Sequence, residues 1–172
     1  MISGRVQVYT GDGKGKTTAA LGLVVRAAGH GLKSYIGQFM KGQRYGELTA
    51  LGDHPLVKIE QYGSEGCIRR DQVTAEHRAQ ARRGLQTATT AMLSGDYDIV
   101  VLDEINVALW FDLLSIAEVS DLIQRRPPNV ELVLTGRRAP GELIAQADLV
   151  TEMREVRHYF ASGISARAGI EY

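Results

Sequence analysis

Short apolar runs alternate with longer amphipathic stretches along the chain. The apolar runs predict strands at residues 6–10, 34–40, 57–62, 99–102, 130–134 and 149–153. The amphipathic stretches predict helices at residues 17–28, 74–93 and 115–126, and a further helix that begins at Pro140. Strands that alternate with helices in this way are typical of a parallel sheet that carries helices on both faces. We therefore expect an α/β fold with a mostly parallel sheet.

Two segments carry the pattern most clearly. Ala81, Leu85, Ala88 and Met92 recur at steps of four, three and four residues, which is the spacing of one face of a helix. Residues 99–102 are all apolar, as expected of a strand that is buried on both faces. These segments predict that the central strands lie between two layers of helices.

Length and charge narrow the class of protein. The chain has 172 residues without a repeat or a long linker, so we expect one domain over residues 1–172. Lys plus Arg and Asp plus Glu number 20 each, and this balance gives no bulk attraction to nucleic acid or to an anionic membrane. No apolar run approaches the ~20 residues that a membrane span needs. A single cysteine, Cys67, and the absence of a signal-peptide pattern favour the reducing cytoplasm.

A glycine-rich turn connects the first predicted strand to the first predicted helix. Its residues are Gly11, Asp12, Gly13, Lys14, Gly15, Lys16, Thr17 and Thr18. The backbone N–H groups of such a turn point at phosphate oxygens, and the start of the helix adds its positive dipole. We expect Lys16 to contact the phosphates and Thr17 to place its hydroxyl on a metal ion. The usual motif has glycine at the position of Thr10, so the strict pattern fails by one residue.

Two carboxylates, Asp103 and Glu104, follow the apolar strand at residues 99–102. The carboxyl ends of parallel strands meet at one edge of a sheet, and ligands of α/β proteins bind there. Carboxylates at this edge suit the magnesium ion of a bound nucleotide. The sequence therefore predicts a site for ATP or GTP with Mg²⁺ (or Mn²⁺). An Asn-Lys-x-Asp sequence that would read guanine does not occur.

Several motifs together resemble the ATP:corrinoid adenosyltransferases of the phosphate-loop type. They are TGDGKGKTT at residues 10–18, RAAGHG at 26–31, QFMKG at 38–42, VVLDE at 100–104, LTGR at 134–137 and FASGISARAGIEY at 160–172. The turn alone is unspecific, but the set is highly specific and covers nearly the whole chain. The glycine spacing at Thr10 is this family's own variant. The resemblance implies a phosphate-loop NTPase (RecA-like) architecture.

The resemblance also implies a reaction. The family transfers the 5′-deoxyadenosyl group of ATP to the cobalt(I) of a reduced corrinoid and releases triphosphate, in cobalamin biosynthesis or salvage. Cobalt(I) itself attacks C5′ of the ribose, so the reaction needs no side-chain base. The family holds its nucleotide in reverse, so the turn is expected to contact the end of the triphosphate farther from the reacting carbon.

Roles for single residues follow from the same resemblance. Lys16 and Glu104 are expected to act in catalysis by stabilising the departing triphosphate. Thr17 and Glu104 are expected to bind Mg²⁺ (or Mn²⁺), with Asp103 as an outer partner of the metal. Lys41 is expected to contact the nucleotide or the corrinoid.

Further expectations concern Arg26, the corrinoid pocket and the partners. Arg26 stands at the family's arginine position and is expected to help hold the nucleotide. Relatives carry an aromatic pair after the third strand, whereas this chain has no aromatic residue between Gly63 and Tyr97. Either activity depends on Cys67 or Ile68 instead, or the preferred corrinoid differs from that of the relatives. The family also implies a homodimer and an electron-donor flavoprotein.

Two other classes of function stay open from the sequence. One is a phosphate-loop kinase or ATPase that transfers or hydrolyses the γ-phosphoryl group. The other is a nucleotide-gated corrinoid-binding module without turnover. The products separate them, since an adenosyltransferase leaves triphosphate, a kinase or ATPase leaves ADP, and a binding module leaves ATP unchanged. Trp110 is expected to pack in the core rather than to border a ligand.

Overall fold

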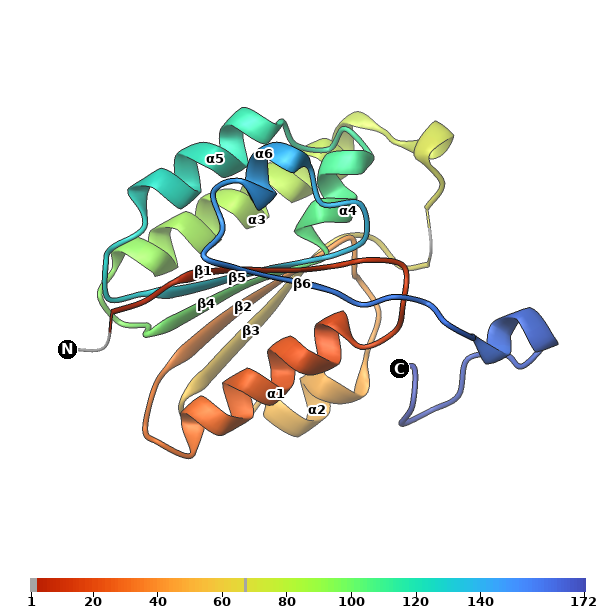
Figure 1. Ribbon diagram of the computed structural model, residues 1–172, viewed down its shortest axis with the longest axis horizontal. Helices are drawn as coiled ribbons and strands as arrows, with labels where there is room; N and C mark the ends of the chain where they lie inside the picture. Colours follow the sequence, from red (N-terminus) through yellow and green to blue (C-terminus); the bar gives the residue numbers. More distant parts are fainter. Residues whose placement is uncertain (1–2, 67) are drawn as a thin grey trace.

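A six-stranded parallel sheet forms the centre of the protein in a computed structural model that describes residues 3–66 and 68–172 (Figure 1). The strands are β1 (Val6–Thr10), β2 (Ser34–Phe39), β3 (Val57–Tyr62), β4 (Ile99–Asp103), β5 (Glu131–Thr135) and β6 (Leu149–Glu152). Their order across the sheet is β3-β2-β4-β5-β1-β6. Every neighbouring pair is parallel, so the predicted α/β class is confirmed.

Helices cover both faces of this sheet. On one face lie α1 (Lys16–Ala28) and α2 (Gly46–Leu51), and on the other lie α3 (Ala75–Leu93), α4 (Ile105–Trp110), α5 (Ile116–Arg125) and α6 (Gly141–Ile144) (Figure 1). Two 3₁₀ turns span Arg70–Gln72 and Tyr159–Ser162. This arrangement agrees with the predicted phosphate-loop NTPase fold. Within the described residues, no helix combines the length and the apolar character needed to cross a membrane.

Alternate residues of the central strands pack into two separate cores. Val100 and Leu102 of β4 lie in the core that contains Met92 of α3 and Leu122 of α5. Val101, between them, lies in the core that contains the buried apolar side chains of α1. Successive side chains of a strand point to opposite faces, so a strand between two apolar layers favours apolar residues at consecutive positions. This explains the unbroken apolar run at residues 99–102.

The structure also contains elements that the sequence pattern did not predict. The helices α2 and α4 have six residues each, which is under two turns and too short to show a helical period. The second strand ends at Phe39, one residue earlier than predicted, because Met40 takes a left-handed backbone with φ of 57°. Trp110 does not pack in the core as predicted. It is 38% exposed, and the guanidinium of Arg138 lies 4.3 Å from its ring centroid.

The strand order brings the two predicted motifs to one edge of the sheet. β5 lies between β4 and β1, and the three strands run in the same direction. The glycine-rich turn after β1 and Asp103 at the end of β4 therefore lie on either side of Thr135, the last residue of β5.

Gly84 marks a tight contact between α3 and the sheet. A Cβ atom at this position would lie 2.6 Å from Cγ of Tyr62 and 3.0 Å from Cε1 of Phe39. Because Cγ is the root of the tyrosine ring, the whole side chain would have to move. We predict that Gly84→Ala lowers the free energy of unfolding by about 1–3 kcal/mol, as overpacked core variants do.

Gly22 in α1 provides the matched control, since a Cβ atom there would meet nothing within 4 Å. Gly22→Ala should raise the free energy of unfolding by about 0.5–1 kcal/mol, because alanine is the better helix former. Urea unfolding of both variants measures the difference. If Gly84→Ala were as stable as Gly22→Ala, the close contact of α3 with Tyr62 would be wrong.

Candidate active site

The glycine-rich turn packs against the end of β6, and this contact explains two of its glycines. Gly13 donates its backbone N–H to the carbonyl of Met153 over 2.6 Å. A Cβ atom on Gly11 or Gly13 would lie 2.5 or 2.6 Å from the same carbonyl oxygen. Gly11 also has a φ of 91°, which residues with a side chain rarely adopt. The shape of the turn is therefore fixed by the edge of the sheet.

Lys16 is the first residue of α1 and lies folded over this turn. Its Nζ donates hydrogen bonds to the carbonyl oxygens of Gly11 and Gly13, each over 2.6 Å. Burial lowers the pKa of Lys16, while the carboxylate of Glu104 acts in the opposite direction. The ammonium group is therefore held at the start of α1, where the free backbone N–H groups add partial positive charge.

Asp103 is the buried centre of a hydrogen-bond network and is 1% exposed. Its Oδ1 accepts hydrogen bonds from the hydroxyls of Thr17 (2.9 Å) and Thr135 (2.7 Å). Its Oδ2 accepts from Nζ of Lys41 (2.8 Å) and Nε2 of Gln38 (3.3 Å). Protein donors thus occupy both carboxylate oxygens. Asp103 holds its neighbours in place from behind the cavity, and its role as an outer partner of a metal stays a prediction.

Lys41 supplies the positive charge that balances Asp103. It follows β2 and also lies 3.5 Å from Oε1 of Glu47. Burial alone would lower the pKa of Lys41, but the adjacent Asp103 carboxylate raises it overall. Lys41 also lines the cavity described below. Its ammonium group therefore lies between the hydrogen bonds of Asp103 and the cavity.

Glu104 holds an unusual backbone conformation between β4 and α4. Its φ is 61° and its ψ is 18°, in the left-handed region, and its N–H donates to Oγ1 of Thr135 over 3.0 Å. Burial raises the pKa of Glu104, and the neighbouring Asp103 carboxylate adds to this effect. The carboxylate accepts no hydrogen bond or ion pair from the residues that the structure describes. It lines the cavity and is available to a ligand.

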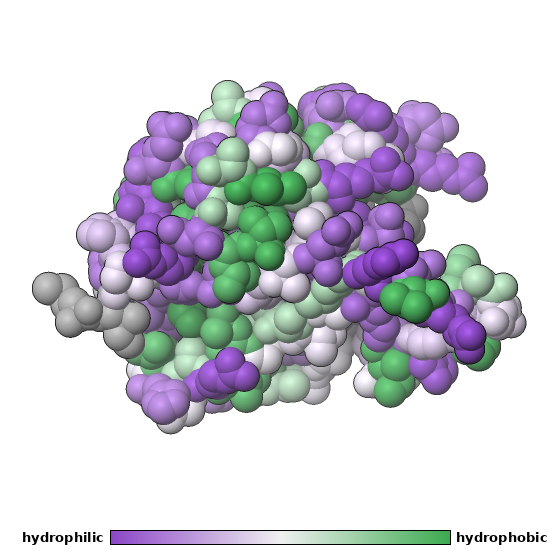
Figure 2. All heavy atoms as spheres, viewed as in Figure 1, coloured by the Kyte–Doolittle hydropathy of each residue, from purple (hydrophilic) through white to green (hydrophobic). Residues whose placement is uncertain are grey.

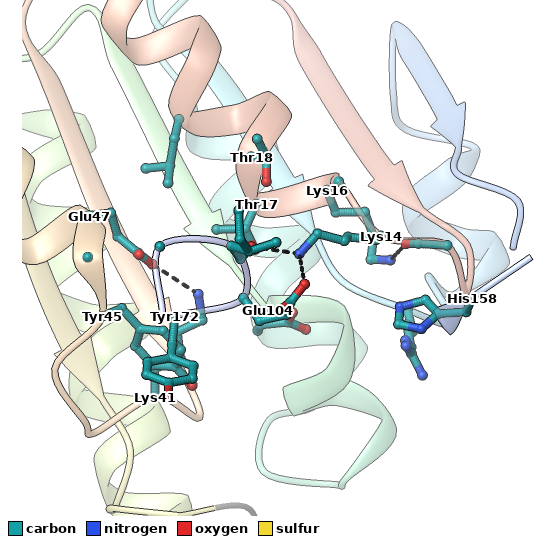
Figure 3. Close-up of a pocket in the computed structure, with 18 residues that line it drawn as sticks. Lys14, Lys16, Thr17, Thr18, Lys41, Tyr45, Glu47, Glu104, His158 and Tyr172 are labelled. Atoms are coloured by element: carbon teal, nitrogen blue, oxygen red, sulfur yellow. Dashed lines mark hydrogen bonds and ion pairs between the residues drawn. The ribbon is translucent and has the colours of Figure 1, made fainter. Parts of the chain in front are cut away.

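A cavity of about 540 Å³ opens between the turn, the start of α1 and the end of β4 (Figure 3). Its walls come from five parts of the chain, namely residues 13–18 with Leu21, Lys41 with residues 45–47, Glu104, Arg137, and His158 with residues 169–172. Figure 3 shows Glu104 facing the start of α1, and Tyr45 and Tyr172 at another side of the cavity. This volume is in the range of small-molecule binding sites.

The C-terminal segment runs back over the turn and closes one side of the cavity (Figures 1 and 3). Lys14 donates to the carbonyl of Ile170 over 2.8 Å and pairs with Glu171 at 3.2 Å. Glu171 also accepts hydrogen bonds from the Tyr159 hydroxyl and from the backbone N–H of Arg167. These bonds, that of Tyr159 first, lower the pKa of Glu171 to about 2. The segment thus places a carboxylate on a lysine of the turn.

Oxygen donors for a divalent cation stand at the start of α1 and the end of β4. No group of three or more His, Cys, Asp or Glu side chains within residues 3–66 and 68–172 is arranged to hold a metal ion. Mg²⁺ in nucleotide sites takes only one or two protein ligands, and phosphates and water complete its shell. Thr17 donates its hydroxyl proton to Asp103, so the hydroxyl lone pairs remain for a cation. Thr17 and Glu104 therefore fit such an ion.

The structure gathers nearly all of the predicted site residues in one place. Gly13, Lys14, Gly15, Lys16, Thr17, Thr18, Lys41 and Glu104 line the cavity. Gly11 and Asp12 belong to the same turn, and Asp103 lies directly behind it. The roles assigned to these residues remain predictions, but their proximity is a property of the fold.

Arg26 is the exception and requires a correction. It lies in the last turn of α1, about 15 Å beyond Lys16 at 1.5 Å per residue. There it lines a separate cavity at the opposite end of the sheet, together with His30 and Asp98 (Figure 1). Within one chain, Arg26 is therefore not a nucleotide-binding residue of the phosphate-loop cavity.

Several residues of the site were missed from the sequence. Thr135 and Gln38 bind Asp103, although only the motifs that contain them stood out. Glu47 is on an unpredicted helix and accepts a hydrogen bond from Gln38 over 2.9 Å. Glu171 belongs to the C-terminal motif at residues 160–172, for which no helix, strand or contact was predicted. The spacing of hydrophobic residues carries no signal for such contacts.

The segment after β3 forms a narrow cleft apart from this cavity. The cleft is lined by Met40, Tyr62, Gly63, Ser64, Gly66, Ile68, His77, Gln80 and Leu113. Ile68 is partly buried and packs against the core, so its predicted contact with the corrinoid remains a prediction. Cys67, the other predicted residue, lies outside the described residues.

Comparison with known proteins assigns the chain to a family. The family of ATP:corrinoid adenosyltransferases BtuR/CobO/CobP matches residues 3–172. A corrinoid adenosyltransferase of Pseudomonas aeruginosa is 38% identical over 170 residues, which cover 98% of this chain and 84% of that protein. Those of Escherichia coli K12 and Salmonella typhimurium are each 36% identical over 98% of this chain and 86% of their own length.

The chain belongs to the ATP:corrinoid adenosyltransferase family. The resemblance read from the motifs is thereby confirmed, and so is the prediction of an enzyme of the transferase class that uses ATP and a corrinoid. The phosphate-loop cavity is the part of the fold that suits the ATP of such an enzyme. The family assignment does not favour the two alternative functions, a phosphate-loop kinase or ATPase and a corrinoid-binding module without turnover.

The contact of Lys14 with Glu171 generates a prediction. Glu171 competes with a triphosphate for the same ammonium group, and its negative charge repels the ligand. Glu171→Gln should therefore bind ATP several-fold more tightly than the wild type does. Isothermal titration calorimetry at low ionic strength measures this affinity.

Glu155→Gln is the matched control, because Glu155 is an exposed carboxylate of the same segment for which no ion pair is found among the described residues. It should leave the affinity for ATP unchanged. Weaker binding by Glu171→Gln would contradict the competition and would instead mean that the C-terminal segment contributes to the bound state.

Proposed function

We propose that this chain transfers the 5′-deoxyadenosyl group of ATP to the cobalt of a reduced corrinoid, with intact triphosphate as the second product. Cobalt(I) supplies the electron pair of the new cobalt–carbon bond and becomes cobalt(III). The bond between C5′ and its oxygen breaks, and that oxygen leaves with the triphosphate. No proton changes place, so the reaction asks the protein for positioning and for stabilisation of negative charge.

The observation that carries this proposal is the cluster of positive groups in the cavity of a chain that belongs to this family. Lys14 and Lys16 stand on the turn, and the start of α1 adds its dipole. A triphosphate that departs from carbon carries one more negative charge than it does as part of ATP, and this charge is spread over its phosphate oxygens. Groups that are already fixed in place stabilise that charge without reorganisation. We propose that the triphosphate lies along the turn in reverse, with its far end at Lys16.

Mg²⁺, or Mn²⁺ in its place, is the proposed metal. Oγ1 of Thr17 and the carboxylate of Glu104 would hold it together with phosphate oxygens, since all of these are hard donors. When bound, the metal would offset the charge of the triphosphate. Asp103 would orient Thr17 from behind through the hydrogen bond between their side chains.

A homodimer, a flavoprotein electron donor and a cytoplasmic location complete the proposal. The edge strand β6 leaves Leu149 and Val150 exposed by 44% and 41%. Figure 2 shows apolar atoms across the middle of this face, which supports contact with a second copy. Cobalt(I) requires a strong one-electron donor, and a reduced flavin suits that task. The single cysteine of the chain supports a reducing compartment.

An anaerobic assay with ATP and chemically reduced cob(I)alamin tests the proposed function. It should yield a light-sensitive alkylcobalamin spectrum and one triphosphate for each corrinoid converted. ADP with an unchanged corrinoid spectrum would contradict the proposal and favour a kinase or an ATPase. Binding without any product would favour the module without turnover.

Lys16→Ala should lower the rate of this assay by about two orders of magnitude or more, because it removes a preorganised charge at the triphosphate. The free energy of unfolding should change little, since the hydrogen bonds of the ammonium group found among the described residues all go to carbonyls of the turn. Lys33→Ala, which removes an exposed lysine outside the cavity, is the matched control and should retain full activity. Equal rates for the two variants would exclude Lys16 from the reaction.

A further inference from the structure

The Thr135 hydroxyl connects the two acidic residues at the end of β4. Thr135 is the last residue of β5 and is fully buried. Its Oγ1 donates to Oδ1 of Asp103 over 2.7 Å and accepts the backbone N–H of Glu104 over 3.0 Å. One oxygen atom on a neighbouring strand thus contacts both residues.

A hydroxyl can make both of these bonds through one oxygen atom. The Asp103 carboxylate accepts hydrogen bonds, whereas the Glu104 amide donates one, so the group between them must be both donor and acceptor. Valine has the same shape as threonine and can do neither. Serine retains the hydroxyl and loses only a methyl group.

The conformation of Glu104 depends on this bond. A residue with a side chain stores strain in the left-handed region, and such strain persists only where the surroundings hold it. The Glu104 carbonyl accepts the N–H of Ala108 in the first turn of α4, and its own N–H is taken by Thr135. The backbone of Glu104 is thereby held on both sides, and this fixes where its carboxylate enters the cavity.

The same oxygen of Asp103 also accepts the Thr17 hydroxyl, over 2.9 Å. A continuous chain of hydrogen bonds therefore runs from the Glu104 amide through Thr135 and Asp103 to Thr17. It joins β4, β5 and the start of α1. Its two ends lie at Thr17 and Glu104, the two residues proposed to hold the metal.

We propose that Thr135 is a positioning residue that sets the geometry between the Thr17 hydroxyl and the Glu104 carboxylate, and with it the affinity of the cavity for a divalent cation bound to ATP. This inference rests on the proposed function through the metal–ATP complex alone. Thr135 touches neither the metal nor the nucleotide in this role. It acts by fixing the two groups that do.

The test compares Thr135→Val with Thr135→Ser and with the wild type. Mn²⁺ binding in the presence of ATP, without corrinoid, is followed by electron paramagnetic resonance. Thr135→Val should bind Mn²⁺ about 10- to 100-fold more weakly, which is the usual loss when an outer partner of a metal ligand is removed. Thr135→Ser should stay within about threefold of the wild type, since it keeps the hydroxyl that orients both ligands.

Ser34→Ala is the matched control. Ser34 is a fully buried residue at the start of β2, and its hydroxyl has no hydrogen-bond partner among the described residues. It should bind Mn²⁺ as the wild type does. Thr135→Ala provides a second loss of the hydroxyl if Thr135→Val does not fold, and it should show the same weak binding.

Wild-type affinity in either variant without the hydroxyl would overturn the proposal. So would a serine variant as weak as valine, because packing of the methyl group would then be the cause. A wild type that binds no Mn²⁺ with ATP would overturn it as well. Loss of Mn²⁺ by Thr135→Val together with no adenosylation by the wild type would support the positioning role and reject only the proposed reaction.

Discussion

The buried carboxylate of Asp103 is the interaction on which the rest of the site depends. Burying an unpaired charge is very costly, so its four donors are a requirement of the fold as much as of the site. They come from α1, β2, the segment after β2, and β5. Removing one partner of such a buried pair usually costs about 3–5 kcal/mol. The same bonds that make the carboxylate tolerable therefore bring separate elements to one point.

The function of the cavity follows from the side-chain groups that this hydrogen-bond network leaves without a protein partner. Asp103 has its oxygens occupied, and Lys16 is held by the carbonyls of the turn. The carboxylate of Glu104 has no hydrogen-bond or ion-pair partner among the described residues. Asp103 organises its neighbours, and the next residue, Glu104, presents its carboxylate to the cavity, where it can hold a cation at a fixed place. The C-terminal segment adds the carboxylate of Glu171 as a counter-charge to Lys14 at one side of the cavity.

The sequence predicted what depends on local pattern. Strands such as β4 and helices such as α3 carry their period in the chain itself, and the turn at residues 11–18 is a contiguous motif. Prediction from the sequence failed for contacts between residues that are distant along the chain, such as those of Lys14 with Glu171 and of Thr135 with Asp103. The misplacement of Arg26 was avoidable, because the rise of a helix already separates it from Lys16. Helices of six residues, such as α2, are too short for any period to show.

In the proposed reaction, the bond between C5′ and its oxygen breaks in the phosphate-loop cavity. ATP labelled with ¹⁸O at the oxygen between C5′ and the α-phosphorus tests this step, in an anaerobic reaction with cob(I)alamin and mass spectrometry of the products. All of the label should leave in the triphosphate. Label that stays on the adenosine side would show that a phosphorus–oxygen bond breaks instead and would contradict the proposed reaction.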